Sequence, residues 1–444
     1  MDTVIHGEYP NGRDGIASLI QINARSTMES EYMYGDEPIS AFNSKYEQHT
    51  PFDKESSEVF NSKAIVGPNT ASHPITDETG VFGNSLIFNV DTRMSECMGH
   101  LILMVHLPDI SRYGLRWTND IGYAMIESIK IVNGGEELVK YTGEYLHIRS
   151  LLNLPSCKKN GINSMVGHYN STFSLNGASR ALYVPIPFME SHLDVQYFPV
   201  FLAGTNTFQV HVNVRPIRDL IYIHANNEVQ CQFTLNPGSN SVGVQFNTKN
   251  LISFDGDIEP RFKARVLYDA FHLSNPERLL FSTRSGKLLY QYVQERTVRM
   301  ERNIKSVNLQ LDFINTVSHM VITVKPDCAM DRNLYFSYTP LSTLKLMLDG
   351  VVVNKSHQND DKLSASKFRY IQPNTNIPSK WIYVIPFCVS CKQTQPSGYF
   401  TMSGTQRNML TLDRDTSIDV NCTVTVHALT YKTLVFDDAA ISMM

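Results

Sequence analysis

The sequence has few charged residues and no cluster of positive charge. Charged side chains make up 18% of the 444 residues, the formal net charge is -4, and Lys and Arg do not gather in any segment. A protein that binds nucleic acid needs a basic surface to neutralise phosphates, so direct contact with nucleic acid is not expected. Because 42% of the residues are hydrophobic, the chain can bury large cores and lacks the composition of a disordered protein.

Long apolar runs are also absent. No stretch approaches the ~18 consecutive apolar residues of a membrane-spanning helix. The first residues, 1–4, do not form a basic segment followed by an apolar one, as a secretory signal would. The sequence therefore favours a protein that is made and kept in the cytosol.

Cysteine is scarce and irregularly spaced. The seven cysteines are an odd number spread over a long chain, unlike the dense, even sets of disulfide-rich secreted domains, so we interpret them as free thiols. Cys388 and Cys391 have the spacing of a zinc half-site or a redox pair. No second Cys pair or His pair follows to complete four ligands. We interpret the pair as part of a strand and its loop, and no metal site is predicted.

Sequence motifs for catalysis and cofactor binding are missing as well. The 14 histidines are scattered, none in a metal-binding spacing such as His-Glu-x-x-His. No Gly-rich phosphate loop or nucleophile elbow is present. The sequence predicts neither a catalytic residue nor a cofactor.

Alternation of apolar and polar residues is the dominant pattern. Short alternating runs separated by Gly, Pro, Asn, Asp and Ser predict strands with one face toward a core. The clearest are residues 101–107, 208–214, 307–313 and 422–429. Asn133, Gly134 and Gly135 separate two apolar runs and predict a tight hairpin, with positive φ at Asn133 and Gly134. Helices are expected to be few and short, as over residues 143–152.

Length and strand spacing predict an all-β protein of two tandem domains. A chain of 444 residues exceeds one ordinary domain, and a polar stretch over residues 226 to about 250 separates two strand-rich halves. Each half suits an eight-stranded antiparallel jelly roll with short helices in its loops. We expect two all-β domains with their boundary near residue 222.

Four blocks follow one another in a recognisable order along the chain. They lie within residues 19–52, 116–146, 182–188 and 395–403. Their distinctive residues are Pro38, Phe42, His49, Phe52, Trp117, Asn119, Gly122, Gly134, Gly135, Gly143, Glu144, Pro185, Pro187, Phe188, Pro396, Ser397 and Gly398. In this order the blocks resemble the major capsid proteins of nucleocytoplasmic large DNA viruses, in the iridovirus-like branch or its relatives.

The resemblance implies a structural function without catalysis. It implies a double jelly roll, with an N-terminal arm over residues 1–24, jelly roll 1 over 25–222 and jelly roll 2 over 223–444. Three such chains would form a homotrimeric, pseudo-hexagonal capsomer, and neighbouring capsomers would tile the icosahedral shell of the virion. It also implies minor capsid and penton proteins as partners, no direct contact with nucleic acid, and contact with an inner membrane only through other proteins. Synthesis in the host cytoplasm would follow.

Two alternatives stay open. A transient assembly scaffold with the same fold, as in poxviruses, would share these motifs, because fold does not determine function. A glycan-binding β-sandwich would cluster exposed aromatic residues in its loops, whereas the 21 tyrosines and 22 phenylalanines are spread along the chain.

Three of the motifs carry structural expectations. Trp117 is expected in a core with its indole N–H hydrogen-bonded to a nearby acceptor. Pro185 and Pro187 remove backbone donors, so their segment is expected at a sheet edge or bend. Pro396, Ser397 and Gly398 predict a tight turn.

Overall fold

The computed structural model describes most of the chain from residue 51 onward. The described residues are 51–61, 79–92, 95–111, 115–168, 179–188, 197–203, 207–223, 260–283, 286–331, 334–354, 380–391, 396–402, 407–415, 419–437 and 440–443. The expected N-terminal arm lies outside them, as do Pro38, Phe42 and His49.

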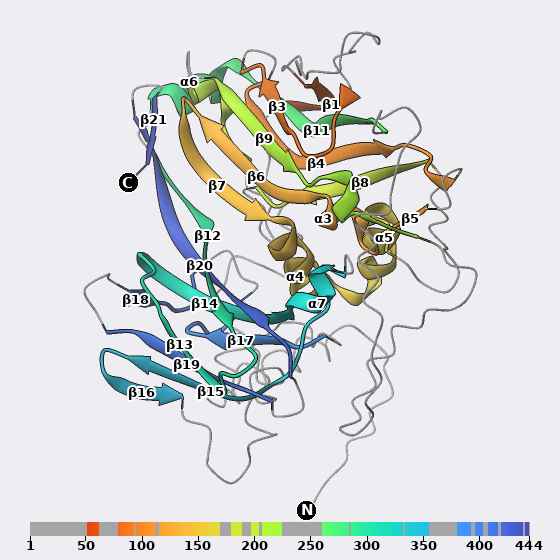
Figure 1. The fold of residues 1–444 in the computed structure, drawn as a ribbon. Helices are drawn as coiled ribbons and strands as arrows, with labels where there is room; N and C mark the ends of the chain where they lie inside the picture. Colours follow the sequence, from red (N-terminus) through yellow and green to blue (C-terminus); the bar gives the residue numbers. More distant parts are fainter. Residues whose placement is uncertain are drawn as a thin grey trace, which may run out of the picture. The chain divides into compact units, whose positions relative to one another are not determined.

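The first group of strands forms two facing antiparallel sheets (Figure 1). One sheet has the order β1 (Phe52–Phe60), β11 (Phe262–Leu273), β4 (Cys97–Leu107) and β8 (Arg180–Ile186), with β2 (Thr79–Gly80) beside β11. The other has the order β3 (Ser85–Val90), β9 (Phe208–Val214), β6 (Ile126–Asn133) and β7 (Glu136–Thr142). Apart from β2 and the two short strands β5 (Leu115–Trp117) and β10 (Ile221–Ile223), which pair with each other, this roll has eight strands in the described part of the chain. One sheet takes the first, third, sixth and eighth of them along the chain, which is jelly-roll topology.

The second group of strands repeats this topology. One sheet has the order β12 (Gly286–Met300), β20 (Cys422–Asp437), β14 (Asn315–Pro326) and β17 (Ile382–Pro386), with β18 (Phe400–Met402) and β21 (Ala440–Met443) at its margins. The other has the order β13 (Ser306–Gln310), β19 (Met409–Arg414), β15 (Leu341–Leu348) and β16 (Val351–Asn354). The predicted double jelly roll is therefore confirmed.

The change from one jelly roll to the other does not fall near residue 222. β11 begins after that position, yet it lies between β1 and β4 in the first sheet. A boundary at residue 222 would remove a central strand from its hydrogen-bonded neighbours. The strands of the second roll begin only with β12, after helix α6 (Asn275–Thr283). The polar stretch over residues 226–250 thus precedes a strand of the first roll; its own residues lie outside the described part.

Helices are short and lie between strands, as expected. They are α3 (Ile121–Ala124), α4 (Gly143–Asn153), α5 (Ser156–Val166), α6, α7 (Asp327–Asp331) and the 3-10 helices η2 (Val200–Ala203) and η3 (Ile217–Asp219). A two-stranded ribbon joins β5 (Leu115–Trp117) to β10 (Ile221–Ile223). Every helix in the described part is too short or too polar to cross a bilayer.

The hairpin between β6 and β7 forms where the sequence predicts it. Asn133 pairs with Glu136 across the turn. The positive φ angles fall at Gly134 (59°) and Gly135 (89°), not at Asn133. Asn133 instead ends β6 as an extended, buried residue, so the two glycines alone provide the left-handed backbone of the turn.

Burial distinguishes strands with one covered face from strands with two. In β9 buried and partly buried residues alternate, which is typical of a sheet that covers a core on one side. In β14, by contrast, residues 317–324 are all buried. Met320 and Ile322 belong to the core of the second roll, whereas Val321 belongs to the larger core that includes the first roll. The sheet containing β14 is thus covered by its own roll on one face and by the first roll on the other.

Candidate functional site at the junction between the jelly rolls

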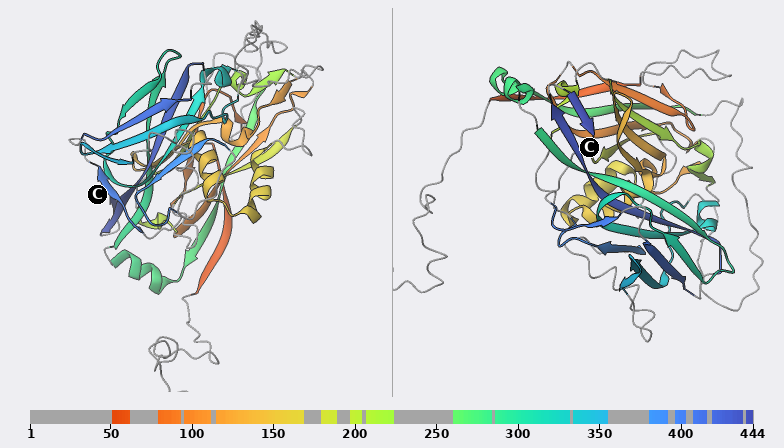
Figure 2. Two further views of the ribbon diagram at one scale, coloured as in Figure 1. Left: turned by 90° about the horizontal axis from the view of Figure 1, so that it is seen from below. Right: turned by 90° about the vertical axis from the view of Figure 1, so that its left-hand side faces the viewer.

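The junction between the rolls is built on helix α4, which Figures 1 and 2 show beside β14 and β20. The Thr142 hydroxyl accepts a hydrogen bond from Tyr145 N (3.3 Å) and so caps the helix. Gly143 is required by close backbone approach, because a Cβ there would lie 2.1 Å from Tyr123 O and 2.4 Å from Ile126 O. The absence of a side chain lets α4 begin directly against the preceding chain.

Glu144 connects α4 to β14 of the second roll. Thr323 donates a hydrogen bond to its Oε1 (3.0 Å), and Lys325 Nζ forms an ion pair with its Oε2. Burial alone would raise the pKa of this carboxyl, but Lys325, His427 and the two hydrogen bonds hold the pKa below its ordinary value. Glu144 is therefore a buried, paired carboxylate that links the two rolls.

Asp120 forms a second buried acidic centre, just before α3. Its backbone is left-handed (φ 54°), and its side chain is only 3% exposed. His168 Nδ1 donates to Asp120 Oδ1 at 2.7 Å, and His147 Nδ1 lies 3.7 Å from Oδ2. Burial opposes ionisation, but the hydrogen bond from His168 and the nearby positive charge of Lys380 lower the pKa of Asp120.

His147 joins this centre to the second roll. Its ring stacks on Phe336 with centroids 4.0 Å apart, and Lys380 Nζ lies 2.9 Å from its Nε2. Burial and the Lys380 ammonium lower the pKa of His147 to about 3. The imidazole is therefore neutral, so its Nε2 accepts the hydrogen bond from Lys380.

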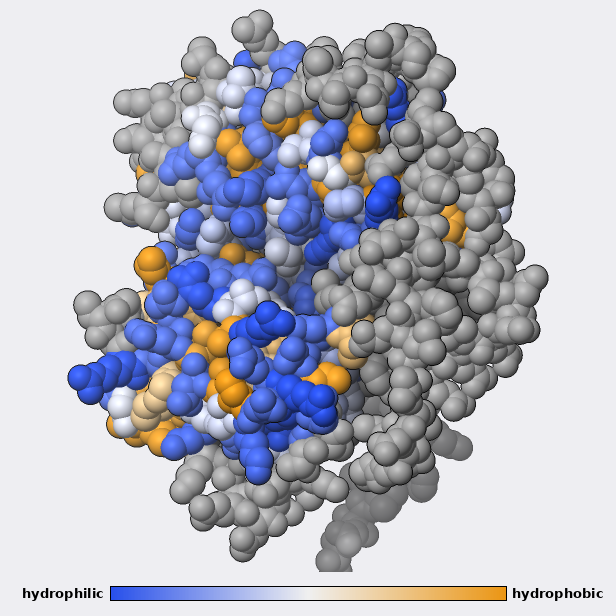
Figure 3. All heavy atoms as spheres, in the orientation of Figure 1, coloured by the Kyte–Doolittle hydropathy of each residue, from blue (hydrophilic) through white to orange (hydrophobic). Residues whose placement is uncertain are grey.

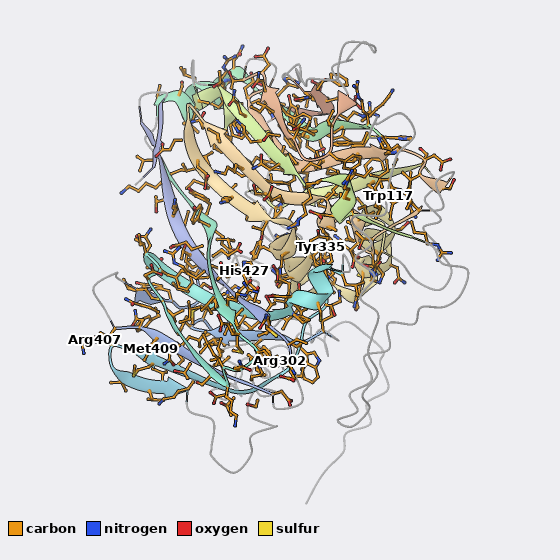
Figure 4. All side chains as sticks on the ribbon, viewed as in Figure 1. Trp117, Arg302, Tyr335, Arg407, Met409 and His427 are labelled. Carbon is orange, nitrogen blue, oxygen red and sulfur yellow. The ribbon has the colours of Figure 1, made fainter. Side chains whose placement is uncertain are left out.

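Aromatic rings lie near these polar links, and Figure 4 labels two of the residues, Tyr335 and His427. The Arg215 guanidinium lies 4.6 Å from the ring centroid of Tyr335, across the two rolls. Tyr290 of β12 donates to Leu138 O of β7 at 3.1 Å. The ring of His427 on β20 is fully buried, 5.7 Å from that of Tyr145, and neither ring nitrogen has a hydrogen-bond partner in the described part of the chain.

The sequence motifs separate into those at the junction and those elsewhere. Gly143 and Glu144 lie at it, and Asn119 is beside it, where its Oδ1 accepts from Asp120 N (3.0 Å). Gly122 lies in α3, where a Cβ would meet Val166 O and Val184 Cγ2 at 3.0 Å. These small or polar residues allow α3, α4 and α5 to pack closely at the junction.

Other motif residues stabilise the first roll. Pro185 lies in β8, which pairs only with β4 among the described strands, so the predicted edge position is confirmed. Pro187 O accepts from Tyr141 Oη at 2.7 Å. Phe188 is buried with its ring 5.3 Å from that of Phe198. Phe52, at the start of β1, is 55% exposed, so it contributes little to the core.

Trp117 is buried as expected, but its hydrogen bonding is not as expected. The ring is 1% exposed and stacks on Phe82 with centroids 5.9 Å apart. Its Nε1 has no hydrogen-bond partner among the residues described. The expected hydrogen bond is missing because Trp117 packs in an aromatic cluster with Phe82 and Phe262, whose rings offer no acceptor oxygen.

The residues that complete the junction carry little sequence signal. Lys325, Phe336 and Lys380 lie far from α4 along the chain, and the pattern over residues 143–152 indicates His147 only as part of a short helix. A lysine directly after a mostly apolar run, as Lys325 is after residues 320–324 of β14, is the one local hint of a buried ion pair.

Figure 3 shows that the described side chains on one face of the molecule are mostly hydrophilic, with hydrophobic groups in separate places.

Comparison with known proteins agrees with this architecture. Residues 40–240 match the family model described as major capsid protein N-terminus. Probable capsid protein 4 of Acanthamoeba polyphaga mimivirus is 22% identical over 225 residues, which are 48% of this chain and 40% of that protein. The match thus spans about two-fifths of the length of this curated relative.

The alignments with solved structures of similar fold extend over nearly the whole chain. PBCV-1 VP54, fitted into a reconstruction of the virophage Sputnik, has a TM-score of 0.70 at 13% identity, covering 91% of this chain and 99% of that one. The Faustovirus major capsid protein has a TM-score of 0.64 at 10% identity, covering 96% and 98%.

Strand order, junction and comparisons together define the class of protein. By its fold it is a double jelly-roll protein, as are the solved capsid proteins that it resembles. Over residues 40–240 the chain matches the N-terminal region of the major capsid protein family.

Proposed function

We propose that three copies of this chain form a pseudo-hexagonal capsomer, and that capsomers tile the icosahedral shell of a virion. The observation that carries the proposal is the repeated strand order. One chain holds two jelly rolls of the same topology, so a threefold axis would arrange six similar domains in a ring. Closed symmetry of this kind is the usual form of a homo-oligomer.

The junction between the rolls supports this function. A tile must keep its two domains in one orientation, and the buried links from Glu144 to Lys325 and from His147 to Lys380 join them. The sheet containing β14 is buried on both faces, so separating the rolls would expose apolar surface to water. The pair should therefore behave as one rigid body.

The proposal extends to the partners and the location of the protein. The capsomer would contact neighbouring capsomers, minor capsid proteins and penton proteins, and would reach an inner membrane only through other proteins. The protein would be made in the host cytoplasm. The net charge of -4 and the absence of basic clusters in the sequence support a shell without direct contact to nucleic acid.

Light scattering on the purified protein tests the proposal. We expect a particle of three times the 50.3 kDa chain mass, with a hexagonal outline in negative-stain images. A folded monomer at every concentration examined would contradict it. Mass spectrometry of purified virions then separates a shell subunit from a transient scaffold, because only the shell subunit stays abundant in finished particles.

A further inference from the structure

Three potential metal ligands meet at the end of the sheet that contains β14 and β17. His319 lies on β14, and Cys388 and Cys391 follow β17. One ligand atom from each, a ring nitrogen and two sulfurs, lie within 4.8 Å of one another. All three residues are at most 9% exposed. They are outside the links between the rolls described above.

Strand pairing explains why these residues meet. His319 is directly opposite Pro386, the last residue of β17, and Phe387 N donates to Ser318 O at 2.9 Å. The chain that carries the two cysteines therefore leaves β17 beside His319. Ser318 Oγ lies 3.2 Å from His319 Nδ1 and donates to Cys388 Sγ at 3.4 Å. Such a contact orients a ligand from the second coordination sphere.

The segment of Pro396, Ser397 and Gly398 holds the cysteine loop in place. Ser390 N donates to Ser397 Oγ (2.9 Å), which in turn donates to Ser390 O (3.0 Å). Gly398 has φ +147°, and a Cβ there would lie 2.8 Å from Phe387 O and 3.0 Å from Cys388 Cα. Residues 396–399 form no turn in the described structure, so the predicted tight turn is not seen there. The segment instead packs one loop against another and fixes the backbone around both sulfurs.

We propose that His319, Cys388 and Cys391 bind one zinc ion. Thiolate sulfur and imidazole nitrogen are the ligands that zinc prefers, and a site with three protein ligands takes a water as the fourth. The two sulfurs are 3.5 Å apart, close to the roughly 3.8 Å that tetrahedral Zn–S bonds impose. A disulfide would need about 2.05 Å.

The ion would act as a structural cross-link within the second roll. Cys388 and Cys391 form a half-site that the sequence alone could not complete, and His319 supplies the missing ligand through the pairing of β14 with β17. The ion would join β14 to the loop after β17. Because zinc binds the folded site and no such site exists in the unfolded chain, its binding free energy would add to the stability of the second roll.

Metal content of the full chain, purified without a metal-binding tag, is the first test. Elemental analysis is expected to find about one zinc ion per chain. The double variant C388S/C391S and the variant H319A should each lose this zinc. Cys422→Ser is the matched control, because Cys422 is also buried in the second roll, and it should keep the full zinc content. A wild-type protein without stoichiometric zinc after growth with zinc, or a double variant that retains it, would overturn the proposal.

A metal titration keeps the test independent of how the variants fold. Chelator-treated wild-type protein is titrated with Co²⁺, and a thiolate-to-cobalt charge-transfer band should saturate at one equivalent and disappear when Zn²⁺ is added. Absence of that band would overturn the proposal. So would a peptide map showing Cys388 disulfide-bonded to Cys391 in freshly purified, unreduced protein, because both sulfurs would then be unable to bind the ion.

Discussion

Glu144 at the start of α4 forms a buried ion pair with Lys325 on β14, so one carboxylate and one ammonium group join the two jelly rolls. The side chains are 9% and 14% exposed. Thr323, two residues before Lys325 on the same face of β14, donates to the second carboxylate oxygen. The Gly-Glu pair of the sequence motif therefore has two separable functions: Gly143 admits the helix, and Glu144 attaches it to the other roll.

Replacing Glu144 with Gln should destabilise the protein by about 3–5 kcal/mol, because it leaves the Lys325 ammonium buried without its counter-charge. Urea unfolding of the two proteins measures this difference. The double variant E144Q/K325M should recover much of the loss, since no unpaired charge remains. The exposed pair of Arg302 with Asp419 is the control, and D419N should change stability little. Equal effects of E144Q and D419N would refute the importance of the buried pair.

Gly143→Ala should be among the most damaging single-methyl changes in the chain. The added Cβ would meet two backbone oxygens at 2.1 and 2.4 Å, and relief requires movement of α4, so we expect a loss of at least about 3 kcal/mol. Gly161→Ala is the matched control, because nothing lies within 4 Å of a Cβ there and the position is within α5. It should stabilise the protein by roughly 0.5–1 kcal/mol. Thermal unfolding compares the two, and similar behaviour would contradict the close approach at Gly143.

Acid should weaken the junction through His147. Its pKa is about 3 in the folded protein and 6.5 ordinarily. Between these values the unfolded chain binds more protons, so stability falls as the pH drops below 6.5, by about 2 kcal/mol at pH 5. The lowered pKa of Glu144 and that of Asp120 act in the same direction below their ordinary values. Stability therefore decreases continuously with acid from pH 6.5 downward.

Unfolding of wild type and His147→Gln in urea, at neutral pH and near pH 5, measures how much His147 contributes to the loss of stability in acid. The variant should show a shallower loss, because a glutamine cannot take up the proton that the unfolded histidine binds. His272→Gln, at a partly exposed histidine on β11, is the control for removing an imidazole from the chain. An unchanged pH dependence in H147Q would rule out His147 as the source.

Trp117→Phe should cost less than about 1.5 kcal/mol, because it removes a buried N–H without a hydrogen-bond partner and keeps an aromatic ring against Phe82. Trp117→Ala should cost about 3–5 kcal/mol, since it opens a large cavity. Denaturant unfolding of the two variants checks the difference. A loss in W117F as large as that in W117A would show that the indole N–H has an acceptor after all.

Local patterns were enough to predict the fold class. The alternation over residues 208–214 became β9, and Gly134 and Gly135 became the turn of a hairpin, because side-chain direction in a strand and φ at a glycine are determined within a few residues. The four motif blocks, in their order along the chain, then indicated the family. Prediction of an edge strand at Pro185 succeeded for the same reason, since a missing backbone donor is a property of one residue.

Contacts between distant segments could not be predicted in this way. The domain boundary was placed too early because the polar stretch after residue 226 looks like a linker, whereas hydrogen bonding returns β11 to the first sheet. The partners of Glu144 and of Cys388 come from β14, whose sequence gives no sign of where it pairs. The amino-acid sequence by itself determined the strands and the hairpin turn, because these depend on local periodicity, and its ordered motifs indicated the double jelly roll. Only the tertiary structure decided which side chains meet, because burial and strand pairing place Lys325 against Glu144 and His319 against two cysteines.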